Sequence, residues 1–239
     1  MNEASNTLKE RKNQSFKIFD DIAGTYDLLN RCLSLGIDVL WRKRMMKELP
    51  AGDQLIALDL ATGTGDVALE LAAQKRVAKV QGLDLSTGMV ELGKKKIIKK
   101  GFAHKAQLGI GDGVAVPVAD ESQDVVTLSF GIRNFPDPQL SLKNIHRVLK
   151  PNGRALVMEF GLPKNFLVRA VYLFYFRKLL PFVGNLISGH GDAYTYLNKT
   201  VEDFPYDQDF LNWMKEAGFK NPKAVSLSFG IAFLYIGEK

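Results

Sequence analysis

The sequence predicts an α/β protein with a doubly wound, mostly parallel sheet of seven strands, N-terminal helices and an apolar helical insertion. Three observations predict this fold. Apolar segments of strand length alternate with helical segments from residue 55 to residue 161. A glycine-rich turn joins the first strand of this alternation to its first helix. Aspartates recur where the predicted strands end.

Each element of the alternation follows from a local pattern. Apolar runs predict buried strands at residues 55–61, 78–86, 106–113, 124–130 and 151–161. Helical spacing predicts helices at residues 66–74, 87–101 and 137–150. Gly101 closes the second helix, whereas Asp137 caps the third, with Pro138 in its first turn. The C-terminal residues predict one helix and two strands, which Gly230 separates.

Composition excludes several classes of protein. The chain carries a net charge of +6 and one cysteine, Cys32. A single cysteine excludes a disulfide framework and a cysteine-based zinc site, and with no secretory signal it favours a cytoplasmic location. We expect no metal. The densest basic run, residues 94–100, has helical spacing and no interleaved aromatic residues, so it predicts a solvated helix face rather than a nucleic-acid site.

The glycine-rich turn has the sequence "LDLATGTGDVA", from residue 58 to residue 68. Gly63 and Gly65 allow a tight turn and let a ligand approach the backbone closely. Together with Ala68 they match the dinucleotide pattern G-x-G-x-x-A, and Asp84 follows about 20 residues on. Because glycine turns also serve packing, this pattern alone does not choose a ligand.

Four acids distinguish between the possible ligands. Asp59, Asp84 and Asp112 end successive predicted strands, and Asp66 opens the first helix. In a doubly wound sheet these strand ends converge on one crevice. Their carboxylates would repel a pyrophosphate but suit a cationic nucleoside without phosphate. S-adenosylmethionine is such a ligand, and Asp84 would accept hydrogen bonds from its ribose hydroxyls.

The whole chain, residues 1–239, is expected to form one domain. Its predicted segments are an N-terminal helical cap (1–50), a cofactor-binding core (51–161), an apolar lid or substrate segment (162–204), and a C-terminal helix with two strands (205–239). The apolar run 165–188 contains too many Arg and Lys residues to span a bilayer. It predicts a helix packed over the sheet, a lid or tunnel for a lipid-like substrate, or an interfacial helix.

Seven segments, in order along nearly the whole chain, carry a resemblance to a known family. They are "FDDIAGTYDLLN" (19–30), "LDLATGTGD" (58–66), "GLDLSTGMV" (82–90), "SFGIRN" (129–134), "RVLKPNGR" (147–154), "EFGLP" (159–163) and "DAYTYL" (192–197). The chain resembles class I S-adenosylmethionine-dependent methyltransferases, which have a Rossmann-like fold. More narrowly, it is similar to the ubiquinone/menaquinone biosynthesis C-methyltransferase family. Thr62 and Gly113 depart from common family residues but remove no functional group.

The resemblance implies S-adenosyl-L-methionine as cofactor and a prenylated quinol as substrate. The expected cofactor-binding residues are Asp59, Gly63, Thr64, Gly65, Asp84, Asp112, Gly113 and Ser129. The expected substrate-side residues are Tyr26, Asn30, His190, Tyr194 and Tyr196. Demethylmenaquinol, a methoxy-benzoquinol, or both remain open as the substrate, and so does a homodimer.

Methylation of a ring carbon requires a ring hydroxyl to lose its proton while a positive group holds the developing phenolate. The family assigns such roles to the Arg-Asn pair and to the aspartate of the glycine loop, here Arg133, Asn134 and Asp66. An arginine with a pKa above about 12 is a poor base, so we expect Arg133 to stabilise charge. Asp66 would take the proton through a water, and His190 is the rival base.

Three other functions remain open at this point. The first is a methyltransferase that acts on a soluble small molecule or on RNA. The second is a nicotinamide-dependent dehydrogenase, against which Asp59 and Asp112 argue. The third is a non-enzymatic module that binds membranes through its basic and apolar middle segment.

A prenylated substrate would also require peripheral contact with the inner face of the cell membrane.

Overall fold

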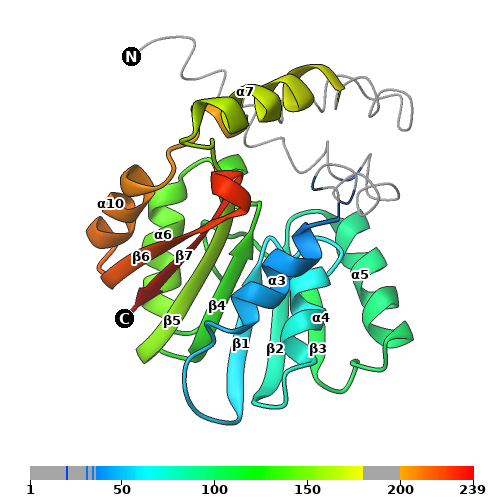
Figure 1. Cartoon of the computed structure of the whole chain (residues 1–239). Helices are drawn as coiled ribbons and strands as arrows, with labels where there is room; N and C mark the ends of the chain where they lie inside the picture. Colours follow the sequence, from blue (N-terminus) through cyan, green and yellow to red (C-terminus); the bar gives the residue numbers. More distant parts are fainter. Residues whose placement is uncertain (1–19, 21–30, 32–33, 35, 180–199) are drawn as a thin grey trace.

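The computed structural model describes residues 20, 31, 34, 36–179 and 200–239. Its centre is a seven-stranded sheet in the order β3-β2-β1-β4-β5-β7-β6 (Figure 1). The strands are β1 (Leu55–Leu60), β2 (Val77–Asp84), β3 (Ala106–Ile110), β4 (Gln123–Ser129), β5 (Leu149–Phe160), β6 (Lys220–Leu227) and β7 (Ala232–Glu238). Strands β1 to β5 pair in parallel, and β7 runs antiparallel to both of its neighbours, β5 and β6. The predicted fold class is therefore confirmed.

Helices cover both faces of the sheet. They are α3 (Asp38–Met46), α4 (Asp66–Ala72), α5 (Thr87–Lys99), α6 (Pro138–Val148), α7 (Phe166–Phe174) and α10 (Gln208–Glu216). Side chains of α3, α4, α5 and α7 belong to one apolar core, and those of α6 and α10 belong to a second core on the opposite face. Burial on both faces explains the long buried apolar runs of the central strands β1, β4 and β5, whereas β2 and β3 also contain exposed or half-buried polar residues.

The predicted boundaries agree with the observed ones to within a few residues, and the differences have local causes. Asp137 caps α6 as expected, since its side chain accepts a hydrogen bond from the backbone N–H of Leu140 (2.9 Å). Helix α6 ends at Val148 because β5 begins at the next residue. Strand β3 ends at Ile110, before the turn that holds Asp112.

The apolar run that begins at residue 165 starts as helix α7 and continues as a short π-helix, η2 (Tyr175–Leu179). The side chain of Asn165 caps α7 through the backbone N–H groups of Leu167 and Val168. Every helix in the described part of the chain falls short of what a membrane span requires. The remainder of the run lies outside the described residues, so its assignment as a lid stays a prediction.

Candidate active site

The glycine turn after β1 and the acid after β2 are joined directly. The backbone N–H of Gly63 donates to Oδ2 of Asp84 (2.8 Å), and the backbone N–H of Ser86 donates to Oδ1 (2.9 Å). Gly63 and Gly65 have φ angles of 54° and 81°, in the left-handed region where glycine is preferred. Burial raises the pKa of Asp84, although these hydrogen bonds oppose the rise. The turn therefore holds the Asp84 carboxylate in a fixed position at the crevice.

Asp59 is buried near the end of β1, just before the glycine turn. Its two carboxylate oxygens accept hydrogen bonds from the hydroxyls of Thr62 and Thr127, each at 2.6 Å. Burial raises its pKa to about 6, and the nearby charge of Asp84 acts in the same direction. Asp59 also lines a small cavity of about 40 Å³ together with residues of the glycine turn and Ser129. It fixes the shape of the turn and ties β1 to β4.

Asp66, the first residue of α4, lies between two cations. Nη2 of Arg42 is 3.0 Å from one of its oxygens, and Nζ of Lys96 is 2.8 Å from the other. Burial alone would raise the pKa of Asp66, but the charges of Arg42 and Lys96 lower it overall. Lys96 also donates to the hydroxyl of Thr64 (2.9 Å). These contacts connect the glycine turn to α3 and α5.

The turn after β3 packs against the segment that follows β4. The Asp112 carboxylate accepts a hydrogen bond from the backbone N–H of Val114 (2.8 Å). The carbonyl of Gly113 accepts one from the Ser141 hydroxyl (2.7 Å). A Cβ atom at Gly113 would lie 2.3 Å from the Phe135 ring, so a larger residue there would require this ring to shift.

Strand β4 ends next to the glycine turn. A Cβ atom at Gly131 would lie 2.5 Å from Cβ of Ala61, so only glycine lets these two loops approach so closely. The chain then enters a 3-10 helix, η1 (Ile132–Asn134), in which Arg133 and Asn134 are buried. The predicted pair therefore lies just beyond the C-terminal end of β4, which Ser129 forms.

Arg133 makes its contacts with β5 and with the end of β4. Its Nη1 donates to the carbonyl of Phe130 (2.6 Å) and to Oε1 of Glu159 (2.7 Å). The guanidinium carbon is 5.5 Å from the centre of the Phe160 ring. Only 5% of the Arg133 side chain and 1% of the Glu159 side chain are exposed. Burial raises the pKa of Glu159, and the charge of Arg133 opposes this rise.

Buried polar atoms without a hydrogen-bond partner gather around this pair. Among the described residues, five of the seven such atoms lie near the ends of β4 and β5 or on α7. They are Oγ of Ser129, Nε of Arg133, Oδ1 of Asn134, Oε2 of Glu159 and the hydroxyl of Tyr172. Because buried polar groups are nearly always satisfied, such a cluster is typical of a site that binds a ligand.

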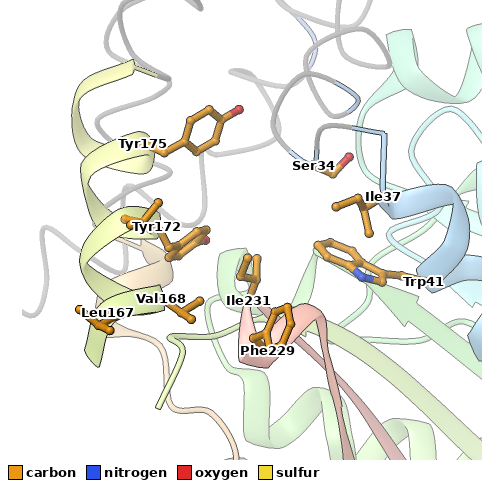
Figure 2. Close-up of a pocket in the computed structure, with 10 residues that line it drawn as sticks. Ser34, Ile37, Trp41, Leu167, Val168, Tyr172, Tyr175, Phe229 and Ile231 are labelled. Atoms are coloured by element: carbon orange, nitrogen blue, oxygen red, sulfur yellow. The ribbon is translucent and has the colours of Figure 1, made fainter. Parts of the chain in front are cut away.

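An apolar cavity of about 520 Å³ lies beside these polar groups (Figure 2). Its lining residues are Ser34, Ile37, Trp41, Leu167, Val168, Val171, Tyr172, Tyr175, Phe229 and Ile231. Figure 2 shows the residues of α7 on one side, Trp41 and Ile37 opposite, and Phe229 and Ile231 between them. The Trp41 ring packs on Phe130 and Phe160, with ring centres 6.1 and 6.4 Å apart. These two rings connect the cavity to Arg133.

The structure brings together the predicted residues of the glycine turn, the strand ends and η1. Tyr26, Asn30, His190, Tyr194 and Tyr196 lie outside the described residues. Sequence reasoning missed Glu159, Tyr172, Trp41 and Arg42. Glu159 offered a signal, since it is an acid at the end of a predicted apolar strand, as Asp59 and Asp84 are. Within the described chain, no group of His, Cys, Asp or Glu side chains is arranged to hold a metal ion.

This strand order, with a glycine turn after β1 and an acid at the end of β2, defines a class I methyltransferase. The profile of the ubiE/COQ5 methyltransferase family matches residues 6–239, and the chain belongs to this family. It is an S-adenosylmethionine-dependent methyltransferase, so the dehydrogenase and the non-enzymatic module are excluded. The observed site fits this cofactor because Asp84 presents a carboxylate and Ser129 an unpartnered hydroxyl at the same crevice.

Curated relatives extend over nearly the full chain. The ubiquinone/menaquinone biosynthesis C-methyltransferase UbiE of Geotalea uraniireducens is 46% identical, covering 97% of this chain and 99% of the relative. The demethylmenaquinone methyltransferase of Thermus thermophilus is 40% identical over 93% of this chain and 100% of the relative. A crystal structure of a SAM-dependent methyltransferase from Thermotoga maritima has the same fold, with a TM-score of 0.67 and 20% identity over 94% of this chain and 99% of that one.

Proposed function

We propose that the protein transfers a methyl group from S-adenosylmethionine to a ring carbon of a prenylated quinol, with demethylmenaquinol as the first candidate. The observation that carries this proposal is the large apolar cavity beside the buried, charged end of β4 and β5. A prenylated quinol has the same two parts, an apolar tail and a polar ring. Relatives named for demethylmenaquinone and for ubiquinone/menaquinone biosynthesis support the same substrate class.

The cofactor would lie against the glycine turn. In this proposal Asp84 accepts hydrogen bonds from the ribose hydroxyls, and the close turn at Gly63 and Gly65 lets the ligand reach the backbone. Thr64, Asp112, Gly113 and Ser129 complete its surroundings, and Asp59 supports the turn from below. When bound, S-adenosylmethionine supplies an electrophilic methyl group on a sulfonium ion.

The reaction requires the quinol ring to become electron-rich. As a ring hydroxyl loses its proton, the guanidinium of Arg133 would stabilise the developing phenolate. Its fixed, water-poor position strengthens this interaction, because the charge needs no reorganisation at the moment of reaction. Asn134 would orient the hydroxyl. Asp66 remains our proposed acceptor through water, although Arg42 and Lys96 make it a weaker base than a free carboxylate.

The substrate's tail implies contact with a lipid surface. Helix α7 and the loop before β7 present large apolar side chains to solvent: Phe166, Leu167, Val171, Phe174 and Phe229. Phe166 is 75% exposed and Phe229 is 81% exposed. Exposed apolar groups clustered beside a cavity are typical of an interaction site. We therefore propose peripheral membrane contact through this surface, with the net charge of +6 favouring anionic lipid. Cytoplasmic location and a homodimer stay predictions.

One assay tests the proposed activity. Transfer of a labelled methyl group is measured in detergent with demethylmenaquinol and, separately, with a methoxy-benzoquinol. We expect turnover with demethylmenaquinol, and the second substrate shows whether both are used. Absence of transfer to either quinol would refute the proposal and leave a soluble small molecule or RNA as the acceptor.

Arg133→Ala tests the proposed mechanism. Turnover should fall by about 100-fold or more, because removing one preorganised group that stabilises a developing anion has an effect of this size. Cofactor affinity, measured by calorimetry, should stay nearly unchanged. A large loss of cofactor affinity would instead place Arg133 against the cofactor.

Membrane contact is tested by sedimentation with vesicles. Val171→Asp and Phe174→Asp should reduce binding to vesicles of anionic phospholipid. Ile98→Asp is the matched control, because Ile98 is equally an exposed apolar residue but lies on α5, away from α7 (Figure 1). Equal losses for all three variants would contradict a specific contact through α7.

A further inference from the structure

We infer that Glu159 is a positioning residue of the methyl-transfer site. Its carboxylate holds the Arg133 guanidinium in the orientation that stabilises the quinol oxygen. The inference rests on the proposed function. Glu159 is the next to last residue of β5, and Arg133 lies in the 3-10 helix that follows β4. Because β4 and β5 are hydrogen-bonded neighbours, the sheet itself places the carboxylate beside the cation.

The contacts of Arg133 are unequally distributed over its guanidinium. Both hydrogen bonds use Nη1, which donates to the Phe130 carbonyl (2.6 Å) and to Oε1 of Glu159 (2.7 Å). Oε1 is itself fixed, because it also accepts the backbone N–H of Phe160 (2.8 Å). Among the described residues, none accepts a hydrogen bond from Nη2. Glu159 therefore anchors one arm of the guanidinium and leaves the other for a ligand.

Stability alone does not explain this pair. Removing two charges from water is costly unless their remaining hydrogen-bonding groups are satisfied. Here Nε of Arg133 and Oε2 of Glu159 are both buried without a partner. An apolar pair of similar volume would avoid this cost. This ion pair is buried beside the cavity, and its hydrogen-bonding groups are only partly satisfied. Such an arrangement suits a site in which a cation must keep one orientation.

The same geometry supplies a mild test variant. In Glu159→Gln the side-chain carbonyl can still accept from Arg133 and from the Phe160 N–H. The amide nitrogen replaces Oε2, which makes no hydrogen bond, so the substitution breaks none. It removes the charge that strengthens the bond to Arg133 and places two amide N–H donors at the buried position of Oε2. Glu159→Ala removes the anchor itself.

The experiment is a double-mutant cycle on the full chain, with demethylmenaquinol and a labelled methyl donor. We expect Glu159→Gln to lower kcat by about tenfold and Glu159→Ala to lower it further, with KM and cofactor affinity unchanged. In the Arg133→Ala background, Glu159→Gln should change kcat less than about twofold, because a residue that acts only through Arg133 has nothing left to position.

Asp124→Asn is the matched control. Asp124 also pairs with a cation, Lys150 (2.8 Å), and accepts a backbone N–H, from Ile56 (2.8 Å), but it lies at the opposite end of β4. This variant should leave kcat unchanged.

Three results would overturn the inference: an unchanged kcat in Glu159→Gln, additive effects of the two substitutions, or a loss of cofactor affinity and thermal stability that accounts for the loss of turnover. If the unaltered enzyme methylates neither quinol, the proposed function fails and the inference fails with it. If the unaltered enzyme methylates demethylmenaquinol but the effects of the two substitutions on kcat are additive, only the inference is refuted and the proposed function stands.

Discussion

Asp59→Asn is expected to stabilise the protein in a pH-dependent manner. Burial raises the pKa of Asp59 from 3.8 to about 6, so the folded state binds its proton more tightly than the unfolded state does. The stability this proton provides is fully present below the unfolded pKa and is lost as pH rises through the folded pKa. At pH 7.5 the ionised carboxylate therefore costs the folded state its full penalty.

The size of the penalty follows from the pKa shift. A shift of about two units corresponds to about 3 kcal/mol at 1.36 kcal/mol per unit. An asparagine carries no charge, and its amide can keep both contacts, accepting from one threonine hydroxyl and donating to the other. We thus expect Asp59→Asn to raise the free energy of unfolding by up to about 3 kcal/mol at pH 7.5 and by less than about 1 kcal/mol near pH 4.

Urea unfolding of the cofactor-free protein, followed by circular dichroism at both pH values, measures this difference. Asp137→Asn is the control, because Asp137 is exposed and asparagine caps a helix as well as aspartate does. Its effect should be small at both pH values. A destabilising effect of Asp59→Asn at pH 7.5, or an equal effect at both pH values, would refute the reasoning.

Two further predictions concern the glycine turn and its neighbours. Asp84→Ala removes the acceptor of two backbone N–H groups and should weaken S-adenosylmethionine binding by about 10- to 100-fold in calorimetry, while unchanged affinity would exclude Asp84 from the cofactor site. Gly131→Ala brings a methyl group within 2.5 Å of Ala61 and should lower the free energy of unfolding by about 1–3 kcal/mol. Gly109→Ala, where the nearest atom is 3.8 Å away, is its control and should have little effect in the same urea titration.

Local patterns predicted the elements of the core and the strand-end acids. The apolar runs and the caps at Gly101 and Asp137 act within a few residues, so the sequence displays them directly. The order of the strands in the sheet is harder to predict from local patterns. That β7 lies between β5 and β6, antiparallel to both, depends on contacts between segments distant in sequence.

The partners of the site residues could not be read from local patterns for the same reason. Arg133 is held by Glu159, and Asp66 by Arg42, through pairs that only the assembled sheet brings together. Trp41 donates to Ser228 (3.0 Å), at the far end of the sequence. Local patterns predicted which residues would carry the chemistry, and that prediction stays open, whereas the groups that hold these residues became visible only in three dimensions.

The position of β7 also constrains how the protein is made. When β5 leaves the ribosome, its parallel neighbour β4 has already been synthesised. Its second neighbour, β7, follows only after α7, α10 and β6 have been synthesised. Until then β5 presents unpaired backbone groups and apolar side chains, which favour aggregation with other chains. We therefore expect the nascent chain to depend on chaperones most strongly between the release of β5 and the insertion of β7.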